Sequence, residues 1–171
     1  MITSPSYTNK QSFVADEFNR IRVRARQRSL FAKVFGKKQE LRFLSEDAWG
    51  ETATKKYAGI QNIPTEKILG TVSRVNDFDQ DFRPLKKHLR QRWVNMFLLH
   101  EEDGWAPIVV HQVGEAYYVE DGHHRVSVAR TMGMMFIEAE VWDHSAPKVE
   151  SCVERHACRL VTNPATVCAA D

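Results

Sequence analysis

The stretch from Val119 to Arg130 constrains the fold of this chain more than any other. An apolar and aromatic run at 116–120 leads into Asp121 and Gly122, and two histidines and an arginine follow directly. After them, small and apolar residues recur at helical spacing, so this stretch predicts a strand, a tight turn and a helix. Glycine at such a turn lets the backbone approach a ligand closely.

The chemistry of this turn favours an anion. Backbone N–H groups at the start of a helix, with the positive end of its dipole, attract negative charge. His123, His124 and Arg125 add basic side chains, and the guanidinium fork of arginine matches phosphate oxygens. The alternative is an ordinary tight turn whose basic side chains lie in solvent. Because positive charge at a helix start opposes the dipole, we expect a phosphate at Asp121–Arg125.

Patterns in the rest of the chain predict further helices and strands. One helical stripe, Val14, Phe18, Ile21 and Ala25, is apolar. In chain order, the predicted elements are a disordered start at 1–10, a helix at 11–35, a short strand at 41–44, a helix cap at 45–47, a strand at 68–72 entered at Pro64, an acidic loop at 76–84, a helix from Pro84 to 102, a hairpin of strands at 108–112 and 116–120, a helix from 122 to 133, a strand at 136–142 and a last helix from Pro147.

Length and composition fit one domain with extensions. The chain has 171 residues, of which 43% are hydrophobic and 27% charged, as is usual for globular proteins. We expect a basic helical extension at 1–62, the main domain at 63–143, and a helix and tail at 144–171. No apolar run has the length of a membrane span, and the first ten residues lack the apolar segment of a signal peptide.

The three cysteines indicate a reducing compartment. They are odd in number and all lie near the C-terminal end, at Cys152, Cys158 and Cys168. This argues against a disulfide framework and predicts a cytoplasmic protein. The thiols are either incidental to the structure or, with His156 between two of them, part of a metal site.

Positive charge concentrates near the N-terminal end. Residues 20–42 hold nine Arg or Lys and one acid, a net charge of +8, which leaves −6 for the remainder of a chain whose total is +2. Two interpretations follow. The arm Arg20–Arg42 binds nucleic acid or an acidic membrane surface, or its helix packs an apolar stripe on the domain and keeps its arginines in water. Phe31, Val34 and Phe35 would also suit a membrane or a partner.

The order of the predicted elements, together with four short motifs, resembles the ParB/sulfiredoxin superfamily of nucleotide-binding domains. The motifs are Ile63-Pro64, Arg83-Pro84-Leu85, Ala106-Pro107-Ile108-Val109-Val110 and Asp121-Gly122-His123-His124-Arg125 with Ala129 and Gly133. The similar region runs from Ile63 to Asp143. This resemblance implies an α+β fold with a small mixed β-sheet flanked by helices, to which the chain adds helical extensions at both ends.

The resemblance also implies roles for the residues of the turn. The equivalent box binds the phosphates of CTP in ParB-type partition proteins and those of ATP in sulfiredoxins, and relatives that phosphorylate free serine carry Asp-Gly-His-His-Arg. By position, Gly122 would approach the ligand, His124 and Arg125 would face the phosphates, and Asp121 would lie at the edge. Because His123 stands where sulfiredoxins have cysteine, we do not expect their thiol chemistry. The 28 residues after Asp143 are too few for the DNA-binding domain of partition proteins.

The acidic loop is the second candidate part of the site, since the resemblance places it near the phosphate box. Arg83 would contact the ligand, and a carboxylate would ligate Mg²⁺ or accept a proton. An equal alternative is a solvated loop in which an aspartate caps the next helix. The candidate catalytic residues are Asp77, Asp79, Asp81 and His123. Spacing typical of a structural zinc site is absent from the region of the two histidines.

Three functions are compatible with these patterns. The first is a nucleoside-triphosphate-binding protein, holding ATP or CTP with Mg²⁺, which hydrolyses the nucleotide or transfers a phosphate. The second is a regulatory or DNA-associated module without catalysis, whose basic arm binds nucleic acid; a nuclease belongs to the same superfamily but fits less well. The third is a protein-interaction scaffold that has lost its ligand.

Overall fold

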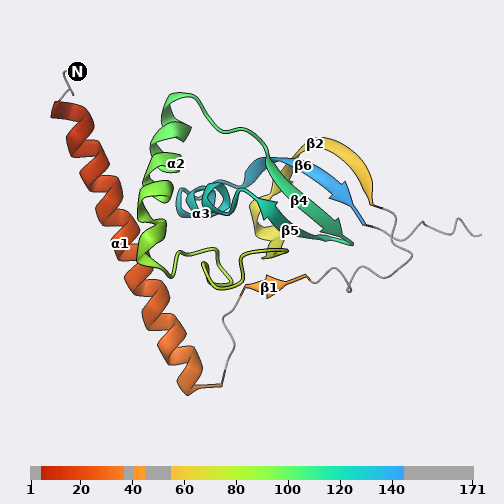
Figure 1. The fold of residues 1–171 in the computed structure, drawn as a ribbon, viewed down its shortest axis with the longest axis horizontal. Coiled ribbons are helices and arrows are strands. Elements are labelled where there is room, and N and C mark those ends of the chain that lie inside the picture. The colour runs from red at the N-terminus through yellow and green to blue at the C-terminus, as the bar shows by residue number, and fades with distance from the viewer. Residues whose placement is uncertain (1–4, 37–40, 45–54, 145–171) are drawn as a thin grey trace, which may run out of the picture.

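The computed structural model describes residues 5–36, 41–44 and 55–144. In chain order, its elements are α1 (Pro5–Val34), β1 (Arg42–Phe43), β2 (Lys56–Pro64), the short 3-10 helix η2 (Thr65–Lys67), β3 (Ile68–Thr71), the 3-10 helix η3 (Lys87–Leu89), α2 (Arg90–Glu102), β4 (Ile108–Val113), β5 (Ala116–Asp121), α3 (His123–Thr131) and β6 (Phe136–Asp143) (Figure 1). The expected α+β class is confirmed.

The strands form one mixed six-stranded sheet in the order β1-β3-β5-β4-β6-β2. β1 and β3, β3 and β5, and β4 and β6 are parallel pairs, whereas β4 with β5 and β2 with β6 are antiparallel. The predicted hairpin of β4 and β5 is confirmed, with Val113 paired to Ala116 across the turn. Both edges of the sheet are therefore strands from the first 64 residues of the chain.

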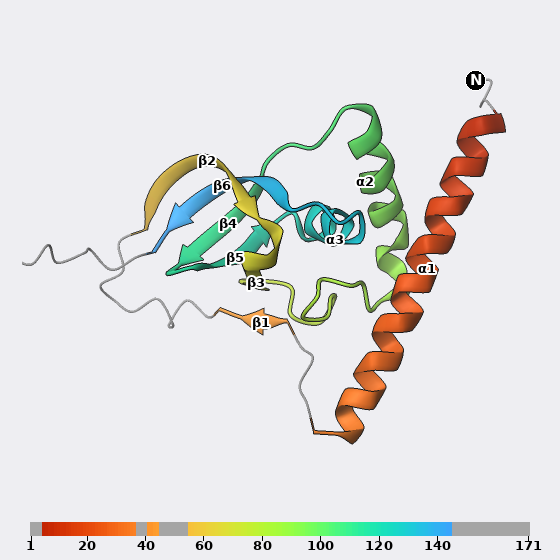
Figure 2. The same cartoon turned by 180° about the vertical axis from the view of Figure 1, so that it is seen from behind.

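The three helices gather at one end of the sheet. α3 lies between the sheet and α2, and α1 packs on α2 (Figures 1 and 2). The fully buried Trp93 of α2 joins them, since its ring is 5.7 Å from the Phe18 ring of α1 and its Nε1–H donates to Ser127 Oγ of α3 at 3.0 Å. This packing fixes α3, and with it the turn that precedes α3.

The long N-terminal helix is confirmed, and its predicted apolar stripe of Val14, Phe18, Ile21 and Ala25 is buried. The prediction of disorder at 1–10 is wrong for residues 5–10, which form the first turns of α1. Polar residues suit an exposed helix as well as a coil, and Lys10 there forms a 2.5 Å ion pair with Glu101 of α2.

A strand that the sequence does not reveal precedes the expected domain. Ile63 and Pro64 end β2 instead of opening a new unit, and β2 pairs with β6 from Lys56 to Pro64. Most of β2 is exposed, so it lacks the alternation of a half-buried strand. The expected boundary between residues 62 and 63 falls inside this strand.

The acidic loop is confirmed, but Pro84 does not begin a helix. Pro84 forms a β-bridge with Phe78, and the N–H of Leu85 donates to the carbonyl of Asp77 at 2.9 Å, so the loop closes on itself. Helical structure starts only at Lys87. The expected helix cap at 45–47, the last helix from Pro147 and the three cysteines lie outside the described residues.

Candidate functional site

Gly122 forms the turn between β5 and α3. Its φ of +103° lies in the left-handed region, and a Cβ here would meet Ile108 Cγ2 at 2.5 Å, so the position requires glycine. Gly122 offers no side-chain cap, and the first helical bond runs from the N–H of Val126 to the Gly122 carbonyl at 3.0 Å. The N–H groups of the first turn of α3 are thus left for another acceptor.

A cavity of about 260 Å³ opens at this turn, between α3 and α2. One part of its wall is basic and another part is apolar, which is the character of a site for an amphipathic anion. The lining residues are Arg74, Arg92, Met96, Leu99, Trp105, Ala106, Asp121, Gly122, His123, His124 and Arg125. All five residues of the predicted turn, 121–125, therefore line one cavity.

Arg125 lines the cavity, and three of the five N–H donors of its guanidinium group are engaged by the protein itself. Its Nη1 donates to the carbonyls of Ala106 at 2.6 Å and Pro107 at 2.8 Å, and its Nη2 donates to Asp121 Oδ2 at 2.5 Å. These bonds tie the first turn of α3 to the segment before β4. Nε and the second N–H of Nη2 make no hydrogen bond within the described residues, so the contact between Arg125 and a phosphate that the sequence predicts would use these two donors.

Arg74 and Arg92 are the cavity cations that the sequence does not single out. Arg92, in the first turn of α2, has no acidic partner among the residues described, and Arg74 is 3.5 Å from Asp77. The backbone N–H of Arg74 donates to Thr71 Oγ1 at 3.1 Å, which fixes the start of its loop beside the turn. These two guanidinium groups are the better candidates for direct contact with an anion.

His123 is a buried wall of the cavity. Its Nε2 lies 2.7 Å from Thr71 Oγ1, and its ring stacks on Phe78 with the centroids 6.1 Å apart. Burial, with the positive charge of Arg74, lowers the pKa of His123 from 6.5 to about 4. The ring is therefore neutral at pH 7 and accepts or donates a hydrogen bond without carrying charge.

His124 carries an unsatisfied buried nitrogen. The residue is 8% exposed and lines the cavity, and its Nδ1 has no hydrogen-bond partner in the described part of the chain. Burial, with the charge of Arg92, lowers the pKa of His124 from 6.5 to about 4. Buried polar atoms in folded proteins are nearly always satisfied, so this nitrogen marks a place where a ligand or water is expected.

The acidic loop contributes little to this cavity. Asp77 approaches it through Arg74. Burial raises the pKa of Asp77, but the 2.9 Å contact with Lys86 and the charges of Lys86 and Arg74 together lower it below its usual value. Asp79 is buried and accepts backbone N–H bonds from Asp81 at 3.0 Å and Arg83 at 2.8 Å, and burial raises its pKa. This aspartate therefore organises the loop.

Two further predicted residues of the loop lie on the side that faces α1. Arg83 and Asp81 form a 2.8 Å ion pair, and both line a separate cavity with Arg24 and Arg130. The structure thus assembles residues 121–125 but does not bring Asp79, Asp81 or Arg83 into the same cavity. Their roles in catalysis and ligand binding remain predictions.

No group of three His, Cys, Asp or Glu suited to hold a metal occurs in residues 5–36, 41–44 and 55–144. Within the same ranges, no helix has both the length and the apolar character needed to cross a bilayer.

Comparison with known proteins gives a partial similarity to solved structures. No family model matches this chain, and no curated protein matches it. Among solved structures, the chain is similar to sulfiredoxin from Arabidopsis thaliana, with 23% sequence identity and a TM-score of 0.38 over 50% of this chain and 86% of that chain.

Proposed function

We propose that this protein binds a phosphorylated small molecule, a nucleotide, in the cavity at the start of α3. The observation that carries the proposal is the convergence of N–H donors and of one unsatisfied imidazole nitrogen on one cavity. Uncapped N–H groups of α3, the guanidinium groups of Arg74 and Arg92, and the unsatisfied Nδ1 of His124 all belong to its wall or border it. Phosphate oxygens are the acceptors that such a set fits.

The apolar part of the wall suits the remainder of a nucleotide. Met96 and Leu99 of α2 face Trp105, whose indole N–H donates to the carbonyl of Met96 at 2.8 Å. The Trp105 ring also packs edge-on against His100, with the centroids 4.4 Å apart. These contacts hold the indole in place, and a fixed aromatic side chain offers contact area to a flat base.

Arg125 has a positioning role in this proposal. It holds Asp121 and the carbonyls before β4, and so shapes the turn that presents the N–H groups. A Mg²⁺ ion carried by a triphosphate would meet Asp121, a carboxylate of the cavity wall whose side chain is 65% exposed. One carboxylate is enough for a metal that keeps most of its contacts with water and phosphate.

Hydrolysis or phosphate transfer would need a general base near the ligand. His123, with its pKa near 4, is a weak base at neutral pH, and Asp77 is engaged by Lys86 at 2.9 Å. Ligand binding is therefore the primary proposal, and catalysis by His123 or by a carboxylate of the loop is its extension.

Isothermal titration of the full chain with ATP, CTP, ADP and inorganic phosphate, with Mg²⁺ or with EDTA, tests the proposal. We expect Arg92→Ala to weaken nucleotide binding by about 10- to 100-fold, because a charge-assisted hydrogen bond contributes roughly 1.5–3 kcal/mol. Arg26→Ala is the matched control, since Arg26 is exposed on α1 away from the cavity. Absence of binding to every ligand, or equal affinity in both variants, would refute the proposal.

A further inference from the structure

The C-terminal end of α1 presents an unusual group of exposed apolar side chains. Leu30, Phe31, Val34 and Phe35 are 65%, 67%, 80% and 75% exposed, and we call these four residues the apolar tip. At positions i, i+1, i+4 and i+5 they share one side of the helix, within about 140° of arc. Contiguous exposed apolar surface of this kind marks an interaction site.

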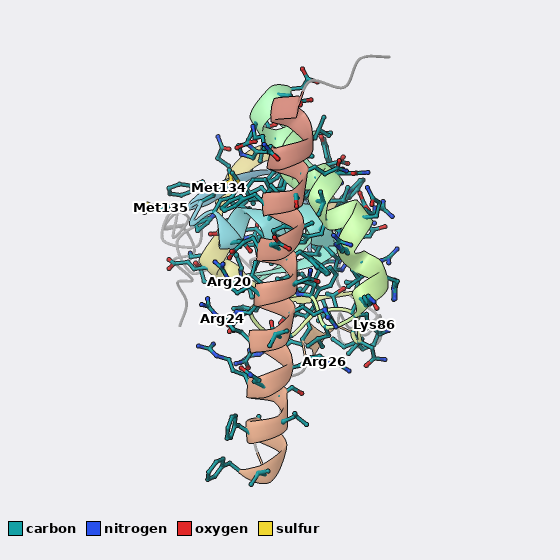
Figure 3. The ribbon with its side chains drawn as sticks, turned by 90° about the vertical axis from the view of Figure 1, so that its left-hand side faces the viewer. Arg20, Arg24, Arg26, Lys86, Met134 and Met135 are labelled. Atoms are coloured by element: carbon teal, nitrogen blue, oxygen red, sulfur yellow. The ribbon has the colours of Figure 1, made fainter. Side chains whose placement is uncertain are left out.

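The helix leading to the apolar tip is strongly basic. From residue 18 to residue 35 the sequence has five arginines and one lysine, and it has no acid. Arg20 pairs with Glu17 at 2.9 Å, and Arg28 lies 3.6 Å from Asp81. Arg24 and Arg26 have no acidic partner within the described ranges, and Figure 3 shows both on α1.

The apolar tip extends away from the rest of the protein. In both views of the ribbon, the C-terminal turns of α1 run past the end of α2 (Figures 1 and 2). Ala32, on the other side of the helix, is buried at 7% exposure, so the four exposed residues face outward. A flat partner can therefore reach the apolar tip without displacing any of the helices and strands that the structure describes.

We propose that the apolar tip and the arginines of α1 bind the surface of an anionic membrane. Lipid headgroups attract the unpaired guanidinium groups, while phenylalanine, leucine and valine enter the boundary with the acyl chains. Nucleic acid would satisfy the arginines, but its phosphates give four aliphatic and aromatic side chains no apolar environment. The combination of unpaired positive charge and exposed apolar side chains thus fits a lipid surface best. This surface is separate from the cavity at α3 and does not depend on it.

Vesicle co-sedimentation of the full chain tests this inference. We expect binding to phosphatidylcholine vesicles containing about 30% phosphatidylserine and not to pure phosphatidylcholine, with weaker binding as salt rises. The double variant Phe31→Ser/Phe35→Ser should bind anionic vesicles at least about tenfold more weakly. Each substitution removes an aromatic ring whose apolar surface would be buried in the membrane. The double variant Arg24→Gln/Arg26→Gln should also bind anionic vesicles at least about tenfold more weakly, because each lost positive charge reduces the affinity by roughly fivefold.

Phe13→Ser is the matched control, because Phe13 is 69% exposed on the same helix but far from the apolar tip. Circular dichroism would verify that every variant keeps its helices. The inference is overturned if the protein does not bind anionic vesicles, or if the double variant Phe31→Ser/Phe35→Ser binds them as well as Phe13→Ser does. It is also overturned if duplex DNA is bound in preference to vesicles, or if sedimentation shows a dimer that buries the apolar tip and excludes vesicles.

Discussion

Acidification from pH 7 to pH 5 should destabilise the protein through the two histidines at the start of α3. His123 and His124 are 3% and 8% exposed, and burial is the main cause that lowers the pKa of each from 6.5 to about 4. The two histidines therefore bind protons near pH 6.5 in the unfolded chain, whereas in the folded protein they stay neutral until the pH approaches 4. The stability that these rings contribute is complete above pH 6.5 and is lost as the pH falls from 6.5 toward 4.

The size of the effect follows from the two pKa values. A histidine whose pKa is 6.5 unfolded and about 4 folded loses about 2 kcal/mol of unfolding free energy between pH 7 and pH 5. Two such histidines lose about 4 kcal/mol if they titrate independently, a large part of the stability of an ordinary domain. An anion in the cavity would stabilise the imidazolium forms and so reduce the loss.

Urea unfolding followed by tryptophan fluorescence at pH 7 and pH 5 measures this loss. His124→Gln keeps a polar side chain but removes one titrating group, so the difference between the two pH values should shrink by about 2 kcal/mol. Burial also lowers the pKa of His111 and His144, but both remain in the variant and cancel in the comparison. The exposed His88→Gln is the control. If the unfolding free energy of His124→Gln falls between pH 7 and pH 5 by as much as that of the unmodified protein, His124 is not a buried neutral imidazole in the folded state.

Two further predictions concern the packing around the turn. Gly122→Ala should lower the unfolding free energy by about 3 kcal/mol, because the new Cβ would sit 2.5 Å from Ile108 Cγ2. Gly114→Ala, where φ is +60° but no atom lies within 4 Å of the Cβ, should cost only about 1 kcal/mol, and equal losses in urea unfolding would contradict the steric argument. Trp93→Phe removes the 3.0 Å hydrogen bond to Ser127 and should lower the thermal midpoint with a loss of about 1–3 kcal/mol, whereas an unchanged midpoint would show that the bond contributes nothing.

The sequence predicts best those parts of the fold whose pattern is local. The β4–β5 hairpin and the turn into α3 follow from alternation, from glycine and from helical spacing, and all appear where expected. The sequence does not predict β2, because its partner β6 is distant in sequence and only Ile63 of this strand is buried. A strand that is exposed on both faces shows no alternation of apolar and polar residues, so it is recognised only from its pairing with another strand.

The same distinction applies to the candidate site. The sequence predicts residues 121–125 because they are consecutive, whereas Arg74 and Arg92 reach the cavity from elements that only the tertiary fold brings together. One signal was available, since Arg92, Met96 and Leu99 at i, i+4 and i+7 share a face of α2. That face lies beside the one that carries the buried Trp93, Val94 and Leu98, and its mixture of charge and apolar surface is typical of the wall of a binding site.

The two outermost strands of the sheet, β1 and β2, have a consequence for how this protein can be shortened. Both precede residue 65, yet they cover opposite margins of the sheet. A fragment cut at the apparent start of the domain, near residue 63, would uncover the main-chain donors and acceptors of β3 and β6 at once. Uncovered margins recruit strands from other molecules, so such a fragment would associate laterally or aggregate. The segment that looks, in the sequence, like an appendage therefore supplies both outer strands of the sheet.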